Sequence, residues 1–315
     1  MSILAALASA ALLSGSIQVE QPRQQPTSDA AATELDSIIV EGRRIEEAAR
    51  AFIEQVGEPP RGTRLARWNR PVCVSVTNMQ PRLAQFVIDR IAVNAFNVGV
   101  DVGEPGCKPN VIILATGDGP ALAKKLVSEI GIGFRPAINH TDLGRNALQD
   151  FQNSDAPVRW WNVTMPVTTD TGDIAITLRS DEAPRTVTVR DGSRLRSNVR
   201  YDMAWTIVII DMSRTNGAPL GVLADYVSMV SLAQVDPAAD LSGQSTVMNL
   251  FRAPQDVSGL TQWDKDYLAA LYAAPTDRAN GRQQDAGVAH ALIQQRRERE
   301  GLEEDGGSAA PDGRE

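Results

Sequence analysis

An unbroken apolar strand followed by an apolar helix, within residues 204–237, constrains the fold of this chain more than any other stretch. Every residue from 205 to 210 is β-branched or aromatic, and the run is bounded by Asp211 and the turn-forming residues 213–217. A strand without polar alternation is covered on both faces of its sheet. We therefore expect a central buried strand.

The helix after this strand is predicted to start near Pro219, which suits a first helical turn, and to end near Val235 before Asp236-Pro237. Its polar residues form only a narrow stripe, each about one turn from the next. They are Asp225, Ser228 and Ser231. A helix that is apolar nearly all round belongs inside a domain.

Residues 72–116 predict a βαβ unit. Two apolar runs, 72–77 and 110–116, read as strands on either side of a helix over 82–96, in which Leu83, Phe86, Val87, Ile91 and Ala95 fall at helical spacing. Cys73 and Cys107 then lie at the same end of two parallel strands, where a disulfide is sterically reasonable. The alternative is two free thiols, because a protein of a reducing compartment can equally contain two cysteines.

The rest of the chain adds strands and helices around this centre. A short strand over 37–40 and a helix over 45–55 precede four arginines, predicted to be a solvated surface rather than an anion site: Arg61, Arg64, Arg67 and Arg70.

A short helix should run from near 142 to 151. Strand 157–163 places Trp160 and Trp161 on opposite faces, with ordinary sheet packing for both or a place in a cleft for one as the alternatives. Residues 174–178 and 186–190 alternate like a hairpin, 245–251 should be briefly helical, and a capping box begins a helix at Thr261.

These elements predict an α/β (α+β) fold. Its mixed sheet should contain the N-terminal βαβ unit, a β-hairpin region and the central buried strand–helix unit, followed by a C-terminal helical part. We expect one globular domain over residues 37–274, an exposed C-terminal helix over 275–299 and a disordered acidic tail over 300–315.

The first 16 residues are predicted to be a signal peptide. Residues 3–13 are apolar apart from Ser9, and small residues follow at 14–16. No Lys or Arg precedes them, so a disordered Ala-rich leader or a misplaced start is the alternative. Residues 17–36 have the composition of a disordered linker. No other stretch approaches the ~18 apolar residues of a membrane span. With the paired cysteines, these features predict a periplasmic or secreted protein without an integral membrane span after cleavage.

Charge and residue types exclude several functions. The net charge of −8 argues against nucleic acid as a partner. The two histidines, His140 and His290, have no spacing typical of a metal site or a catalytic triad. We expect no cofactor and no catalytic metal, although a loop calcium or magnesium site at Asp236 and Asp240 is an alternative.

Carboxylates are the remaining catalytic candidates. Asp211 ends the central strand and Asp225 lies in the buried helix, positions where active sites of open α/β sheets are often built. The alternative roles are a turn or cap residue for Asp211 and a hydrogen-bonded buried group for Asp225. The loop from Thr116 to Pro120 resembles a phosphate loop, but Asp118 as an N-cap explains it without a ligand.

Five groups of residues resemble an uncharacterised family of exported proteobacterial proteins, over roughly residues 71–273. They are Pro71-Val72-Cys73, Gly106-Cys107-Lys108-Pro109-Asn110, Pro157-Val158-Arg159-Trp160-Trp161, Leu223-Ala224-Asp225-Tyr226-Val227 with Leu232-Ala233-Gln234, and Leu260-Thr261-Gln262-Trp263-Asp264 to Leu271-Tyr272. The C-terminal half of that family is similar to zinc-metallopeptidase-like (zincin-like) folds, whose buried helix carries H-E-x-x-H. Here Asp225, Tyr226 and Met229 stand near those positions and do not reproduce the zinc ligands. The resemblance therefore implies a metal-free relative.

Two functional hypotheses follow. The first is a non-catalytic structural or interaction module of the cell envelope, whose partner is an unidentified envelope protein or peptide. The alternative is a hydrolase that uses carboxylates near Asp211 and Asp225, with Tyr226 beside them. A shared cleft with raised carboxylate pKa values favours the hydrolase, whereas a fully buried helix with a satisfied Asp225 favours the module.

Overall fold

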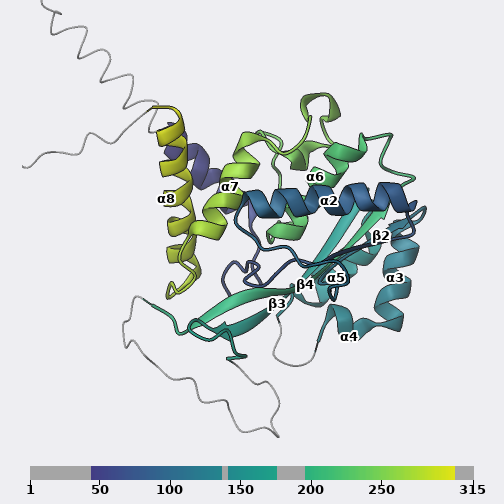
Figure 1. Ribbon diagram of the computed structural model, residues 1–315, viewed down its shortest axis with the longest axis horizontal. Coiled ribbons are helices and arrows are strands. Elements are labelled where there is room, and N and C mark those ends of the chain that lie inside the picture. Colours follow the sequence, from purple (N-terminus) through teal and green to yellow (C-terminus); the bar gives the residue numbers. More distant parts are fainter. Residues whose placement is uncertain (1–43, 137–140, 176–195, 302–315) are drawn as a thin grey trace, which may run out of the picture. The chain divides into compact units, whose positions relative to one another are not determined.

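The described strands form a four-stranded mixed sheet in the order β1-β2-β4-β3 (Figure 1). The structure is a computed structural model and describes residues 44–136, 141–175 and 196–301. The parallel strands are β1 (Val74–Thr77), β2 (Val111–Thr116) and β4 (Val199–Asp211), and β3 (Val158–Thr168) pairs antiparallel with β4. The predicted α+β class is confirmed.

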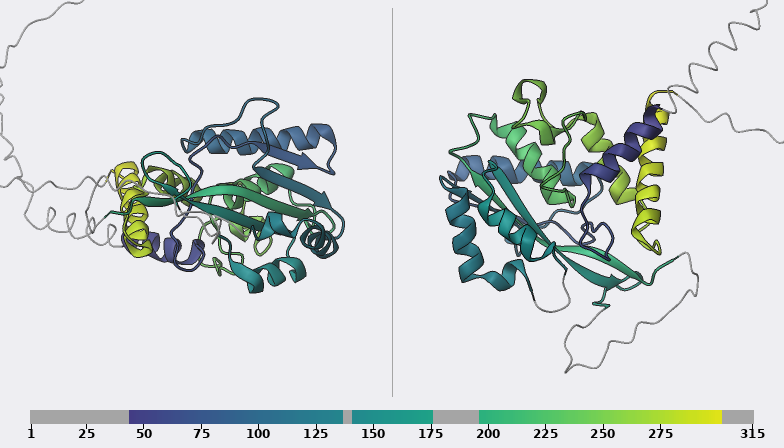
Figure 2. Two further views of the ribbon diagram at one scale, coloured as in Figure 1. Left: turned by 90° about the horizontal axis from the view of Figure 1, so that it is seen from below. Right: turned by 180° about the vertical axis from the view of Figure 1, so that it is seen from behind.

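Helices cover both faces of this sheet. α2 (Pro81–Asn97) and α6 (Leu220–Leu232) share one hydrophobic cluster with the sheet. α3 (Gly119–Glu129), α4 (Gly131–Phe134) and α5 (Gly144–Asn153) share another with its opposite face. Figure 2 shows the strands between α2 and the α3–α5 group. The helix after β2 covers one face of the sheet, and the helix after β4 covers the other. The carboxyl ends of these neighbouring strands therefore form a topological switch point.

The predicted central strand and helix are confirmed. β4 extends further than the apolar run because its first half pairs with β3, which is itself 11 residues long. Pro219 stands at the N-cap of α6, and every residue of α6 from Val222 to Leu232 is buried. The polar stripe of Asp225, Ser228 and Ser231 is therefore inside the protein, where polar groups need partners.

The predicted βαβ unit is present, and its two cysteines are bonded. Cys73 and Cys107 form a disulfide with a Cα–Cα distance of 6.0 Å. α2 buries Val87 and Ile91, but Leu83 and Phe86 are 43% and 46% exposed, so part of its apolar periodicity faces outward. A set of apolar residues at helical spacing does not by itself show which of them face the core.

The predicted solvated surface for the arginines of residues 61–70 is wrong for Arg64 and Arg67. Arg67 Nη1 donates to the carbonyl oxygens of Leu271, Tyr272 and Ala274 at 2.9, 2.5 and 2.8 Å. Arg64 donates to Ser197 Oγ at 3.1 Å and to a main-chain carbonyl of β4. Helix ends leave carbonyl groups without intrahelical partners. Arg67 satisfies those at the end of α7 (Gln262–Ala273).

The C-terminal helices complete the core around a helix over residues 44–56. α7 begins with the predicted capping box of Thr261 and Asp264, after short 3₁₀ turns at Val247–Asn249 and Pro254–Asp256. The expectation that the C-terminal helix is exposed is wrong for one face of α8 (Gly281–Arg299). Val288 and Leu292 of α8 are fully buried. No helix in the described ranges is long and apolar enough to cross a membrane.

Some predictions fall where the structure gives no description. They are the strand over 37–40, most of the hairpin over 174–190, the leader, the linker and the acidic tail. Only Ile174, at the start of the predicted hairpin, is described in a pairing, an antiparallel bridge to Val167 of β3.

Candidate functional site

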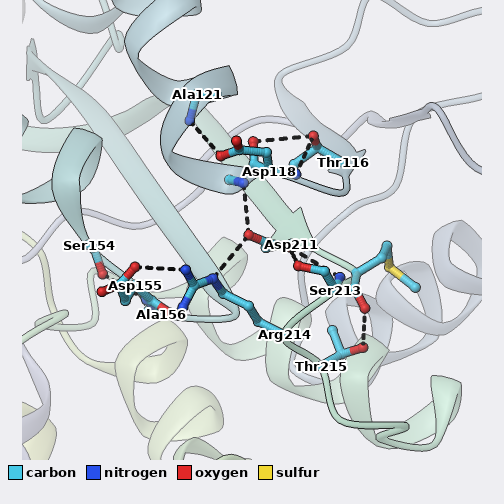
Figure 3. A network of polar contacts seen from close by, with 12 residues as sticks. Thr116, Asp118, Ala121, Ser154, Asp155, Ala156, Asp211, Ser213, Arg214 and Thr215 are labelled. Atoms are coloured by element: carbon cyan, nitrogen blue, oxygen red, sulfur yellow. Dashed lines mark hydrogen bonds and ion pairs between the residues drawn. The ribbon is translucent and has the colours of Figure 1, made fainter.

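Asp211 lies at the carboxyl end of β4, beside the end of β2 (Figure 3). Its Oδ2 accepts a hydrogen bond from Gly119 N at 2.8 Å. Its Oδ1 accepts from Ser213 N at 3.1 Å and from Ser213 Oγ at 2.6 Å, and Arg214 Nε lies 3.4 Å from Oδ2. Burial alone would raise the pKa of Asp211, but these hydrogen bonds and the charge of Arg214 lower it below its usual value. This buried carboxylate joins β4 to α3 through three hydrogen bonds and an ion pair within the described part of the chain.

The loop from Thr116 to Pro120 is a helix cap. Asp118 Oδ1 accepts from Ala121 N at 2.9 Å, as the N-cap prediction requires, and Gly119 N is taken by Asp211. Two carboxylates therefore occupy the amide groups that a phosphate would use and repel its charge. The arrangement gives no support to nucleotide binding at this loop.

Asp225 lies in α6 and contacts α2. Arg90 donates to it through two parallel hydrogen bonds, Nε to Oδ1 at 2.6 Å and Nη2 to Oδ2 at 2.7 Å. Asn94 Nδ2 and Leu260 N also donate to it, at 2.8 and 3.1 Å. Burial favours a raised pKa for Asp225, yet the bonds from Arg90, Asn94 and Leu260 lower it. This is the satisfied buried carboxylate of the first hypothesis.

Asp211 and Asp225 do not form one site. Asp211 bonds to the start of α3 and to the turn after β4, whereas Asp225 bonds to α2 on the opposite face of the sheet. They share no hydrogen-bond partner among the described residues, and neither lines the cavity described next. The hydrolase hypothesis requires a cleft shared by Asp211 and Asp225 and raised pKa values for both carboxylates. The structure shows neither for these two residues.

A cavity of about 1010 Å³ lies along the outer edge of β3. Its lining comes from both faces of the sheet: α5 and the loop before it on one side, and Tyr226 with residues 58–63 and 236–238 on the other. It therefore wraps around the strand edge at Val158–Trp161. Trp160 and Trp161 face opposite sides as predicted, both are buried, and both line the cavity.

The main chain of β3 points hydrogen-bonding groups into this space. Asp211 N donates to Pro157 O at 2.8 Å, so the main-chain carbonyl of Pro157 points toward β4. Because alternate residues of a strand direct these groups to opposite sides, the N–H and C=O groups of Val158 and Trp160 point away from β4. They have no hydrogen-bond partner in the described parts of the chain. Buried main-chain groups without a partner cost free energy.

Of the three catalytic candidates Asp211, Asp225 and Tyr226, Tyr226 alone lines the cavity. It is 6% exposed, its ring lies 6.1 Å from Trp160 and 5.2 Å from Phe251, and its hydroxyl bonds to no described residue. Burial raises the pKa of Tyr226, so the phenol stays protonated and can donate a hydrogen bond. The neighbouring Asp225 points to α2, so Asp225 and Tyr226 do not belong to the same site.

A pair of carboxyl groups on the cavity wall was not expected from the sequence. Gly57 and Val235 form an antiparallel bridge, with Glu58 N donating to Gln234 O at 3.1 Å and Asp236 N donating to Val56 O at 2.9 Å. This brings the side chains of Glu58 and Asp236 into contact. No local signal in the sequence indicates such a pair, because its members lie far apart in the chain.

No group of three or more His, Cys, Asp or Glu residues is placed to hold a metal ion in the described ranges. Of the proposed loop site, Asp240 is paired with Arg252 at 2.9 Å and Asp236 lies against Glu58. His290 is exposed on α8, and His140 lies outside the described residues.

Comparison with known proteins finds no matching family model, no matching curated protein and no matching solved structure. The resemblance to exported proteobacterial proteins and to zincin-like folds therefore stays a prediction.

Proposed function

We propose that this protein is a non-catalytic interaction module of the cell envelope that binds an extended peptide segment along the outer edge of β3 at residues 158–161. The observation that carries the proposal is the pair of outward N–H and C=O groups on Val158 and on Trp160, beside a cavity of about 1010 Å³. An extended peptide supplies a matching donor and acceptor at every second residue. It would satisfy these groups as an additional strand.

The location in the envelope rests on the apolar leader and on the disulfide of Cys73 and Cys107. Absence of catalysis is supported by the state of the two candidate carboxylates. Asp211 and Asp225 are buried, hydrogen-bonded and held with lowered pKa values, which suits fixed structural charges and not general bases near neutral pH.

The test uses full-length protein and a capped, Pro-free decapeptide library with randomised central positions. The best binder is measured by fluorescence anisotropy, together with two variants N-methylated at adjacent positions. One methyl group replaces the N–H that bonds to Trp160, and the other sits on a neighbouring N–H that points away. We expect a roughly tenfold or greater loss of affinity for the first methylated peptide only. That methyl group removes one main-chain hydrogen bond and leaves the carbonyl group of Trp160 without a partner.

Equal affinities for the two methylated peptides, or no library member binding below about 1 mM, would overturn strand addition. Mass spectrometry of the peptide after prolonged incubation tests the other half of the proposal. We expect intact peptide, and cleavage that disappears in Asp211→Asn or Asp225→Asn would restore the hydrolase hypothesis. Self-association seen by sedimentation and abolished by the peptide would make a second copy of this chain the occupant.

A further inference from the structure

The two sides of the cavity differ in charge, and this difference bears on which peptide would fit. On the side of α6, Glu58 and Asp236 stand against one cation, Arg61, so two carboxyl groups and one guanidinium leave a net charge of −1 when both are ionised. The nearby Arg252 is already paired with Asp240 at 2.9 Å. On the side of α5, Asp142 is paired with Arg135 at 3.2 Å. The other charged residues of the lining on that side are Asp150, Arg145 and Arg159.

Strand geometry determines which peptide side chain meets the acidic side. Side chains that lie opposite each other in paired strands project from the same face of the sheet. Trp160 projects toward α6, where its ring lies 6.1 Å from Tyr226. The peptide residue paired with Trp160 therefore points its side chain toward Tyr226, Glu58 and Asp236.

Resting on the strand addition proposed above, we propose that Glu58, Asp236 and Tyr226 form a specificity site that accepts a lysine or arginine side chain from the bound segment. The carboxyl groups face the cationic head. The aromatic rings of Tyr226 and Trp160 pack against its aliphatic stem, which long basic side chains place on apolar surface. The nearly buried Tyr226 lines the cavity and its hydroxyl bonds to no residue in the described ranges, and this is the independent sign that the wall contacts a ligand.

The ionisation of the pair agrees with this role. Burial, the negative charge of Asp236 and a hydrogen bond between the two side chains raise the pKa of Glu58. Two adjacent carboxylates repel each other, and either a proton or a bound cation relieves the repulsion. A lysine head group would replace the shared proton, so affinity for a lysine-containing peptide should rise as the pH increases through the pKa of Glu58.

The experiment compares three peptides that differ only at the residue paired with Trp160: lysine, methionine and glutamate. We expect lysine to bind about tenfold more tightly than methionine, as one charge-assisted hydrogen bond implies, and glutamate to bind worst. In the double variant Glu58→Gln with Asp236→Asn, lysine and methionine peptides should bind within about twofold of each other, and the pH dependence should disappear. Glu129→Gln is the control, because Glu129 is an exposed carboxylate outside the cavity and has no described ion pair.

The outcomes separate this inference from the function on which it rests. Failure of every peptide to bind overturns strand addition itself. Binding with equal affinity for lysine and methionine leaves strand addition standing and overturns the specificity site. Calcium alone binding the wild type but not the double variant, with no preference for lysine, would make the pair a cation site and also overturn it. Urea unfolding of each variant verifies that a lost preference is not a lost fold.

Discussion

Arg90 of α2 holds Asp225 of α6 through two hydrogen bonds of 2.6 and 2.7 Å, joining residues that are 135 positions apart in the chain. The side chain of Asp225 is 1% exposed and that of Arg90 is 45% exposed. A charge buried this deeply is stable only while its partners remain. The pair therefore ties the two helices that cover one face of the sheet.

Arg90→Met should lower the free energy of unfolding by about 1 to 2 kcal/mol. Loss of a partner from a buried ion pair costs more than this, but solvent already screens the half-exposed guanidinium. Urea unfolding checks the value. Arg82→Met on the same helix is the matched control, because Arg82 is exposed and has no described ion pair. Equal effects of the two substitutions would contradict the assigned role of Arg90.

Acid should destabilise the protein through Asp211 and Asp225. Both pKa values are lowered from 3.8 in the folded protein, so below that pH the unfolded chain binds more protons than the folded one. The stabilisation from these carboxylates is present above pH 3.8 and is lost as the pH falls through the lowered values. Glu58, with its raised pKa, contributes the opposite dependence.

The measurement for acid sensitivity is the difference in unfolding free energy between wild type and Asp225→Asn, from urea titrations at several pH values between about 7 and about 2. Using the difference removes the contribution of Glu58. We expect it to shrink steadily below pH 3.8, the ordinary value for this group. A difference that is constant with pH would show that folding leaves the pKa of Asp225 unchanged.

Local signals in the sequence predicted much of this fold. The β-branched run of β4, the apolar surface of α6, and the caps at Asp118 and Thr261 each depend on residues within one or two turns, and all were found where expected. Asp211 and Asp225 are buried and hydrogen-bonded, which is the structural alternative that the sequence analysis gave for each. Their partners were not predicted, because Arg90 and Gly119 reach them only through tertiary packing.

The cavity shows the same limit more strongly. Its acidic wall depends on a bridge between Gly57 and Val235, and its open strand edge depends on which side of β3 pairs with β4. Neither follows from residue spacing. The burial of one face of α8 was missed for a related reason: its apolar stripe is narrow, and only its contacts with the rest of the core show that Val288 and Leu292 are buried.

Reduction of the disulfide should lower the free energy of unfolding by about 3 to 4 kcal/mol on the chain-entropy model. Cys73 and Cys107 are separated by 34 positions, and the bridge restricts the unfolded chain over that loop. Urea unfolding with and without reductant measures the change, and the double variant Cys73→Ala with Cys107→Ala should show no response to reductant. Two freely alkylated thiols in unreduced protein from native cells would contradict the bond.

Gly119→Ala should destabilise the protein by about 1 to 3 kcal/mol, as overpacking of a fixed interior does. A Cβ atom at this position would lie 2.5 Å from Arg159 Nη2 and 3.1 Å from Asp211 Oδ2. Arg159 has little room to move, because it is 3% exposed and donates to Phe151 O and Ala156 O at 3.3 and 3.2 Å. In an unobstructed helix the same substitution stabilises by roughly 0.5 to 1 kcal/mol, so the sign of the effect reports the obstruction.

Gly117→Ala is the matched control for Gly119→Ala, since a Cβ atom added at Gly117 would meet no atom beyond its chain neighbours within 4 Å. A double-mutant cycle with Arg159→Met identifies the obstructing group. If the guanidinium is responsible, Gly119→Ala should cost less in the Arg159→Met background than in the wild type, by at least about 0.5 kcal/mol. Urea unfolding of the four proteins gives the coupling. Additive effects would show that Arg159 yields to the methyl group and that the contact with Asp211 alone requires glycine at this turn.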